Sequence, residues 1–325
     1  MIELKNIRKS FKVLRRDSGL GNAAKSLFKR SYEYIDALVD VSFNINEGEM
    51  IGYLGPNGAG KSSTIKVMSG ILTPDSGECI INGRVPWKDR VDHVREIGVV
   101  FGQRSQLWWD VPVIDSFELL RDIYAVPDGI YKSNLSLLTE MLNIETILKT
   151  PARQLSLGQR MRCEIAASLL HNPKILFLDE PTIGLDAVSK IAVREFIRNI
   201  NRERRTTVIL TTHDMQDIDA LTNRILLIGK GRILLDGALE DLKKRYSLNK
   251  KITVEYSVDA DIITADGISY LDRNVNRIVY TIDTDVISVS EAVNTLTQGK
   301  DVRDISIENT PIDDIIVTIY KEYKI

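Results

Sequence analysis

The chain has 325 residues, of which 43% are hydrophobic and 27% are charged, a composition typical of a folded globular protein. A net charge of −2 gives no reason to expect nucleic acid as the main partner. We find neither a signal-peptide pattern nor about 18 apolar residues in a row, so we expect that the chain does not cross a bilayer by itself.

Two strands are predicted at the start of the chain, over residues 2–11 and 38–45, the second of which alternates apolar and polar residues. Residues 12–30 between them are rich in Lys and Arg, set around a few Leu and Phe side chains. This insertion has two interpretations. It is either a solvated surface loop or a basic amphipathic segment that lies at the cytoplasmic membrane surface or against a membrane partner.

The segment Gly55-Pro56-Asn57-Gly58-Ala59-Gly60-Lys61-Ser62 fits the pattern Gly-x-x-x-x-Gly-Lys-Ser/Thr, which cradles phosphates. Apolar residues predict a buried strand before it and, from Ser63 onward, a helix whose N-terminus points at the phosphates. The glycines allow backbone N–H groups to approach phosphate oxygens. Lys61 offers its charge to the β and γ phosphates, and Ser62 offers its hydroxyl to Mg²⁺. We therefore predict a nucleotide-binding site.

A helical segment is predicted over about residues 104–172, after a strand at 97–101 that ends just before Gln103. Trp108 and Trp109 lie near its start. Because a buried indole N–H needs a partner, these two residues belong either to a local core or to a groove for another protein. The last helix of the segment opens at Leu155-Ser156-Leu157-Gly158-Gln159 and is stopped by Asn172-Pro173.

An apolar strand over residues 174–178 ends in Asp179 and Glu180. A buried parallel strand with acids at its C-terminal tip places them where α/β sheets bind ligands. Asp179 is suited to the Mg²⁺ shell and Glu180 to orienting or deprotonating a water molecule. The alternative is that both acids cap the helix that follows. The next strand, 206–212, delivers His213 to the same rim of the sheet.

The rest of the chain is predicted to close this domain at about residue 240 and to form a second, smaller one. A helix at 188–200 and a strand-turn-strand at 224–235 complete residues 1–240. A charged helix at 239–246 overlaps a linker over residues 241–250. Residues 251–325 predict an α+β accessory domain with three to four strands and one helix, at about 286–296.

Taken together, the P-loop, Gln103, Leu155 to Gln159, Asp179-Glu180, Gly184-Leu185-Asp186 and His213 resemble the ATP-binding-cassette (ABC) family, in its order and approximate spacing. The resemblance covers about residues 1–240. It implies an α/β P-loop ATPase domain with a RecA-like core, an antiparallel β subdomain and the helical subdomain at 104–172. The C-terminal α+β domain is similar to the appendage of exporter ATPases whose permeases are separate chains.

The resemblance also implies roles for the motif residues. ATP is bound by Gly55 to Ser63, with Lys61 on the β and γ phosphates. Mg²⁺ is held by Ser62, Gln103 and Asp179, and Gln103 is also an expected catalytic residue. Glu180 polarises the attacking water, and His213 holds the γ phosphate. Phe11 is the expected ring on adenine, with Tyr32 and Tyr34 as alternatives because the insertion blurs the alignment.

A second copy of the chain completes each site in this family. Ser156, Gly158 and Gln159 of one copy are expected to reach the γ phosphate bound by the other, and Asp186 is expected to link the two sites. Position 157 departs from the commonest pattern, because it carries Leu instead of Gly. A side chain must therefore fit beside the second phosphate site.

The resemblance implies an ATP-hydrolysing subunit of a membrane exporter, held at the cytoplasmic face of the membrane by permease subunits and paired with a second copy. Nucleic acid is not an expected partner. The alternatives are an importer subunit, a soluble ABC ATPase that acts on ribosomes or nucleic acid, and a binding module without useful turnover.

Overall fold

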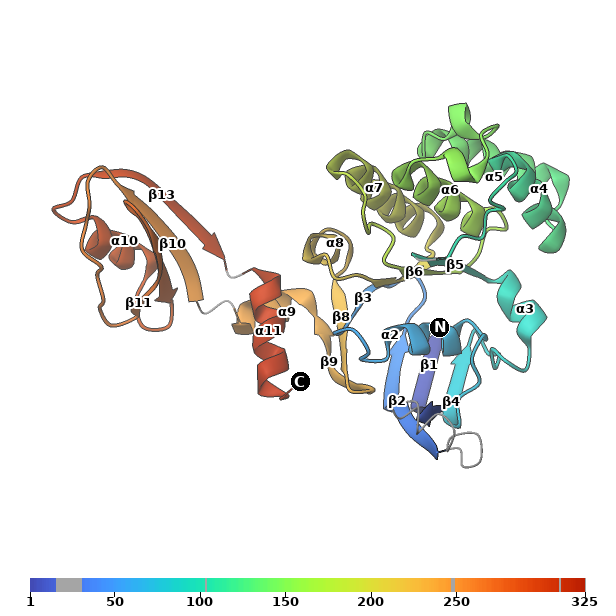
Figure 1. Cartoon of the computed structure of the whole chain (residues 1–325), viewed down its shortest axis with the longest axis horizontal. Coiled ribbons are helices and arrows are strands. Elements are labelled where there is room, and N and C mark those ends of the chain that lie inside the picture. The colour runs from blue at the N-terminus through green and yellow to red at the C-terminus, as the bar shows by residue number, and fades with distance from the viewer. Residues whose placement is uncertain (16–30, 103, 247–248, 310, 325) are drawn as a thin grey trace, which may run out of the picture. The chain divides into compact units, whose positions relative to one another are not determined.

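A computed structural model describes residues 1–15, 31–102, 104–246, 249–309 and 311–324. The chain forms two compact units, Met1–Asp236 and Gly237–Ile325 (Figure 1). In the described residues, no helix has both the length and the apolar character needed to span a membrane.

The first unit is built on one sheet of nine strands with both antiparallel and parallel pairs. Its order is β4 (Ser76–Ile81), β1 (Ile2–Arg15), β2 (Ser31–Ile45), β9 (Arg232–Ala238), β8 (Arg224–Gly229), β3 (Met50–Leu54), β7 (Thr207–Thr211), β6 (Ile175–Asp179) and β5 (Ile97–Phe101). The strands from β8 to β5 run parallel to one another. Their carboxyl ends therefore meet at one edge of the sheet, where α/β proteins bind ligands.

The hairpin of β1 and β2 is longer than predicted. The first strand was expected to end at Phe11 and the second to begin at Leu38, but pairing continues through Phe11 with Ile35 and Val13 with Glu33. Aromatic and β-branched residues such as these stabilise cross-strand pairs. The many Lys and Arg residues of the insertion favoured a loop in the sequence analysis, so this extension of the hairpin was not predicted. Residues 16–30 of the insertion lie outside the described residues.

Buried strands form the core of this unit. Ile175 through Leu178 in β6 are each at most 1% exposed, which is typical of a parallel strand covered on both faces. The helices that contact the sheet include α2 (Lys61–Met68), against β2 and β4, and α8 (Met215–Leu221), against β3. The remaining helices of the core are α3 (Arg90–Arg95) and α7 (Ala187–Arg204).

The segment between β5 and β6 is helical, as predicted. It contains α4 (Val113–Ile123), α5 (Asp128–Met141) and α6 (Leu157–Leu169), which Figure 1 shows gathered on one side of the unit. Two short 3₁₀ turns, Glu145–Ile147 and Ala152–Gln154, lead into α6. The α6 helix packs against α4, α5 and β5, so it connects the helical segment to the sheet.

The second unit has a four-stranded antiparallel sheet in the order β11 (Ile268–Asn274), β12 (Arg277–Asp283), β10 (Asn249–Tyr256) and β13 (Val302–Asn309). Its helices are α9 (Leu239–Tyr246), α10 (Val289–Thr297) and α11 (Ile312–Glu322). Only one helix was predicted after residue 251. The α11 helix was missed because its apolar residues are β-branched, yet Ile315, Ile316 and Ile319 lie on one buried helical face.

Candidate active site

The P-loop joins β3 to α2 and needs glycine at two positions. Gly60 has a φ of 114°, which places it in the left-handed region that side chains disfavour. A Cβ on Gly55 would lie 2.5 Å from the carbonyl oxygen of Ile228. The hydroxyl of Tyr53 donates to Thr64 Oγ1 at 2.9 Å, which ties β3 to α2 behind the loop.

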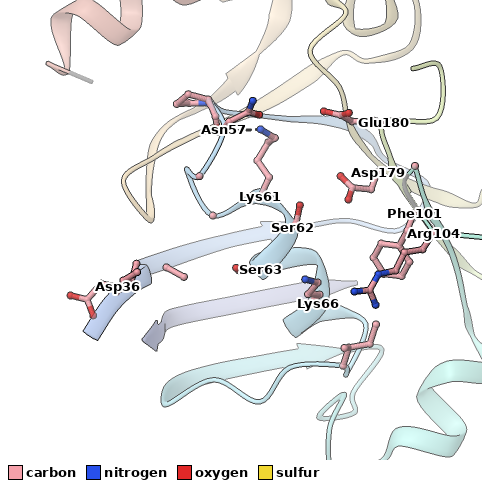
Figure 2. Close-up of a pocket in the computed structure, with 17 residues that line it drawn as sticks. Asp36, Asn57, Lys61, Ser62, Ser63, Lys66, Phe101, Arg104, Asp179 and Glu180 are labelled. Carbon is pink, nitrogen blue, oxygen red and sulfur yellow. Dashed lines mark hydrogen bonds between the residues drawn. The ribbon is translucent and has the colours of Figure 1, made fainter. Parts of the chain in front are cut away.

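A cavity of about 570 Å³ opens in front of the P-loop (Figure 2). The acids at the end of β6 line it together with the loop. Its lining residues are Ile35, Asp36, Ala37, Pro56, Asn57, Gly58, Gly60, Lys61, Ser62, Ser63, Lys66, Ile71, Phe101, Gly102, Arg104, Asp179 and Glu180. Its mixture of backbone amides, cations and carboxylates suits a ligand that carries both phosphate and a metal ion.

Lys61 is held at the centre of this cavity. Its Nζ donates to the carbonyl oxygens of Gly55, at 2.5 Å, and Pro56, at 3.2 Å. Burial lowers the pKa of Lys61, and the nearby carboxylates of Glu180 and Asp179 oppose this effect. A bound polyphosphate would favour the charged ammonium in the same way.

Three neighbouring strand ends bring the other candidate residues together. Because β7 lies between β3 and β6, His213 follows a strand that separates the P-loop from the acids. Thr211 Oγ1 donates to Asp179 Oδ1 at 2.5 Å. Glu180 has a φ of 55°, and its Oε1 lies 3.2 Å from His213 Nδ1.

Sequence reasoning missed the buried group that supports these loops. Asp217 is fully buried on α8 and accepts from the hydroxyls of Thr182 and Thr212, which follow Glu180 and precede His213. Arg194 pairs with the same carboxylate at 2.5 Å. Asp217 thus fixes the two loops relative to each other. A lone Asp on a helix gives no sequence signal of such a role.

The adenine assignment receives no direct support from the cavity lining. Phe11, Tyr32 and Tyr34 are 38%, 44% and 66% exposed, and none of them lines the cavity. Ile35, the cross-strand partner of Phe11, does line it. Gln103, expected as a Mg²⁺ ligand and catalytic residue, lies outside the described residues. Lys66, Arg104 and residues 35–37 were not predicted as lining residues.

The motif at the start of α6 lies apart from this cavity in the same chain. Ser156 caps α6 by accepting from Gln159 N at 3.2 Å, and Gln159 Oε1 accepts from Ser156 N at 2.9 Å. Asp186 caps α7 in a similar way, through Ser189. A Cβ on Gly158 would lie 2.8 Å from Ser189 Oγ, so the two helix starts touch.

Leu157, which departs from the commonest family pattern, is accommodated by Gly184. A Cβ on Gly184 would lie 2.6 Å from Leu157 Cδ2, and Gly184 has a φ of 67°. The leucine side chain therefore occupies space that a residue larger than glycine would need. Ser156 and Leu157 both remain exposed.

Trp108 and Trp109 do not belong to a local core. Their exposed fractions are 60% and 51%, so that interpretation of the sequence is wrong. The Arg160 guanidinium lies 5.6 Å from the centre of the Trp109 ring. Two neighbouring exposed indoles of this kind are typical of a surface that contacts another protein.

Comparison with known proteins agrees with this geometry. The family model described as "ABC transporter" matches residues 38–183. The ABC transporter ATP-binding protein NatA of Bacillus subtilis is 30% identical over 215 residues, which cover 66% of this chain and 87% of NatA. The chain belongs to the ABC transporter family. The P-loop ATPase fold that the sequence motifs predicted is thereby confirmed.

Other relatives place this ABC-type ATPase domain in different settings. The methionine import ATP-binding protein MetN 2 of Enterococcus faecalis is 32% identical, and the match covers 75% of this chain and 67% of MetN 2. A dimeric, post-hydrolysis structure of the ATP-binding cassette MJ0796 with ADP and Pi matches with a TM-score of 0.61 at 27% identity. It covers 74% of this chain and 99% of that one. Some relatives are much longer, and the match covers only 36–37% of the length of four of them.

Proposed function

We propose that the chain binds and hydrolyses ATP in the P-loop cavity and that hydrolysis powers a membrane exporter. One observation carries the catalytic part. Lys61 and Ser62 from the P-loop and Asp179 and Glu180 from β6 line a single cavity, and His213 lies 3.2 Å from Glu180. The ATP hydrolase assignment follows from this cavity and from membership of the family.

Each of these residues has a role that its position supports. Lys61 and the backbone N–H groups of Gly58 to Ser63 neutralise the charge on the β and γ phosphates. Glu180 orients and deprotonates the water that attacks the γ phosphate in line with the leaving oxygen. His213 is 69% exposed as a side chain and does not itself line the cavity, but its contact with Glu180 would fix the orientation of that carboxylate and leave the ring beside the proposed γ-phosphate position.

The oxygen donors in the cavity fit Mg²⁺. Ser62 and Asp179 both line it, and hydroxyl and carboxylate oxygens are the ligands that Mg²⁺ prefers beside a polyphosphate. Gln103 is the third proposed ligand. When bound there, Mg²⁺ would offset the negative charge that develops on the phosphates during transfer.

A second copy of the chain completes the site. Ser156, Gly158 and Gln159 do not line the cavity of their own chain, and Ser156 is exposed, so this helix start is available to another copy. Asp186, which contacts the same region through Ser189, would transmit the state of one site to the other. The dimeric ADP-bound cassette MJ0796 supports this arrangement.

The proposed membrane partner is a pair of permease subunits at the cytoplasmic face, docked on the Trp108–Trp109 surface. The two exposed tryptophans, with Arg160 beside the Trp109 ring, suit an interface with a hydrophobic centre and a polar edge. Two sequence features favour export over import: the insertion after Phe11 is similar to that of some ATPases serving polymer or drug exporters, and residues 251–325 are similar to the C-terminal appendage of exporter ATPases. Import remains the alternative because MetN 2 is an import protein.

Purification from detergent-solubilised membranes tests the partner. A tagged chain is expected to co-purify with a multi-helix membrane protein, and a variant with Trp108 and Trp109 both replaced by Ala is expected to lose it while still binding ATP. Recovery of an extracytoplasmic binding protein in the complex would instead support import. Recovery of ribosomes or nucleic acid would favour the soluble class of ABC ATPase.

A further inference from the structure

A buried carboxylate on α6 holds the loop that follows β5. Glu164 is 4% exposed and lies two turns into the helix that Ser156 caps. It accepts from the hydroxyl of Ser105 and, at 3.1 Å, from the backbone N–H of Gln106. The Gln106 side chain returns a hydrogen bond to the Glu164 carbonyl at 2.9 Å. Burial raises the pKa of Glu164, and the hydrogen bonds from Ser105 and Gln106 oppose this effect.

The residues on the two sides of this loop have different hydrogen-bond partners. On the β5 side, Gly102 N donates to the Asp179 carbonyl at 2.8 Å, so the chain is still attached to β6. After Arg104, the hydrogen bonds of the loop go to the helical segment. Trp108 N donates to Ser116 Oγ on α4, and the Trp109 carbonyl accepts from Arg153 N, both at 3.0 Å.

Glu164 holds the first residues of this loop against α6. Among the described residues, it is the only carboxylate that receives hydrogen bonds from Ser105 and Gln106. Leu107 N completes the turn by donating to Ser105 Oγ at 3.1 Å. The exposed tryptophans follow directly. They are therefore attached to the helical segment, through Ser116, Arg153 and the α6 residues Arg160 and Glu164, and not directly to a strand of the sheet.

We propose that Glu164 is a positioning residue that makes the Trp108–Trp109 surface move with α6. Because Ser156 lies at the start of the same helix, a nucleotide engaged by Ser156 would reorient the tryptophans through this rigid connection. The inference deepens the proposed function and rests on it. It concerns a contact between Glu164 and the loop and leaves the hydrolysis step unchanged.

Tryptophan fluorescence reports on this connection. The chain has three tryptophans, and a Trp87→Phe variant leaves Trp108 and Trp109 as the only emitters. In this background, acrylamide quenching is measured with and without saturating Mg²⁺ and the ATP analogue AMP-PNP. Isothermal calorimetry measures AMP-PNP affinity in parallel. A purely structural role for Glu164 would change affinity and quenching together.

The matched variants are Glu164→Gln, Ser105→Ala and Ser168→Ala. Ser168 is a buried residue on the same helix whose hydroxyl donates only to the Ile165 carbonyl, so it controls for damage to α6. Glu164→Gln is expected to reduce the nucleotide-dependent quenching change by roughly threefold or more, with AMP-PNP affinity within about twofold. Ser105→Ala should give part of this loss, and the double variant no more than Glu164→Gln alone. Ser168→Ala should respond like the parent.

Amide hydrogen exchange separates the connection from nucleotide binding. Without nucleotide, Glu164→Gln is expected to speed exchange at the Gln106 and Leu107 amides by roughly tenfold, and Ser168→Ala to leave them unchanged. Unchanged exchange in Glu164→Gln and Ser105→Ala would overturn the inference. A Glu164→Gln variant that binds AMP-PNP and keeps the full quenching change would also overturn it. The same holds for a parent protein that binds AMP-PNP without any quenching change. Failure of the parent to bind AMP-PNP would instead contradict the proposed function.

Discussion

The two lysines that line the cavity differ in what they contact. The Lys61 ammonium lies against two P-loop carbonyl oxygens, whereas Lys66 lines the same cavity from further along α2. Only Lys61 is placed at the P-loop itself (Figure 2). Lys61 should therefore contribute more than Lys66 to the affinity for the β and γ phosphates.

Replacing Lys61 by Met should weaken MgATP binding by roughly tenfold or more, because a charge-assisted hydrogen bond to phosphate is lost. Lys66→Met is the matched control and should stay within about threefold. Isothermal calorimetry measures both affinities. Equal effects of the two substitutions would show that a diffuse positive charge, and not the P-loop geometry, binds the phosphates.

His171 makes the first unit sensitive to acid. Its Nε2 hydrogen-bonds the Ile97 carbonyl at 2.9 Å, and its ring stacks on Tyr124. Burial lowers the pKa of His171 from 6.5 to about 4. The stabilising neutral ring is thus fully present above pH 6.5, and its contribution is lost as the pH falls toward 4.

Urea unfolding at pH 7 and pH 5 tests whether stability falls with pH in this direction. The wild type should lose about 2 kcal/mol more unfolding free energy between these pH values than His171→Gln, whose amide can still donate to Ile97 but does not titrate. Burial also lowers the pKa of His93, so both proteins retain a smaller slope in the same direction. Identical slopes would contradict the account.

At the scale of elements, the loops after β6 and β7 depend on α8. Asp217→Asn removes the charge that pairs with Arg194 while keeping the shape of the side chain. The change weakens the ion pairing of a partly buried guanidinium, which still lies 3.5 Å from Asp214 Oδ2, and we therefore expect a loss of about 2 kcal/mol in the free energy of unfolding. Asp115→Asn, at an exposed position on α4, should change it by less than about 0.5 kcal/mol. Chemical denaturation compares them, and a small effect of Asp217→Asn would argue against its supporting role.

Elements were predicted correctly where the local sequence pattern and the tertiary packing favour the same structure. The P-loop, the acid-tipped β6, the helical segment and the α9 helix, over Leu239–Tyr246, all lie where the motifs and periodicity indicated. The extended β1–β2 hairpin and α11 were missed because local composition competed with tertiary pairing and packing. Asp217 and Glu164 were missed for a different reason. Their roles depend on partners far along the chain, which no local pattern specifies.

At the scale of the whole molecule, the account requires two copies of the chain. Glu180→Gln with MgATP should form a dimer in size-exclusion chromatography, since bound ATP is not consumed. Adding Ser156→Arg should abolish the dimer, because the bulky cation replaces a helix cap that, in the proposed dimer, faces the other copy. ATP affinity of the single chain should remain within about threefold, since Ser156 does not line its own cavity.

A matched control is available for the lost helix cap. Ser288 caps α10 in the second unit with the same box of hydrogen bonds, through Glu291. Ser288→Arg should cost a similar ~1 kcal/mol of stability yet leave the ATP-dependent dimer intact. Loss of the dimer in both variants would mean that α6 has no special part in assembly.

One cavity should bind ATP through the P-loop and hydrolyse it with the help of Glu180. The decisive measurement is single-turnover phosphate release by wild type and Glu180→Gln, at equal MgATP occupancy measured by calorimetry. The account predicts comparable ATP affinity and a rate that falls by roughly 100-fold or more in the variant. Equal rates in the two proteins, or a wild type that binds no MgATP, would contradict it.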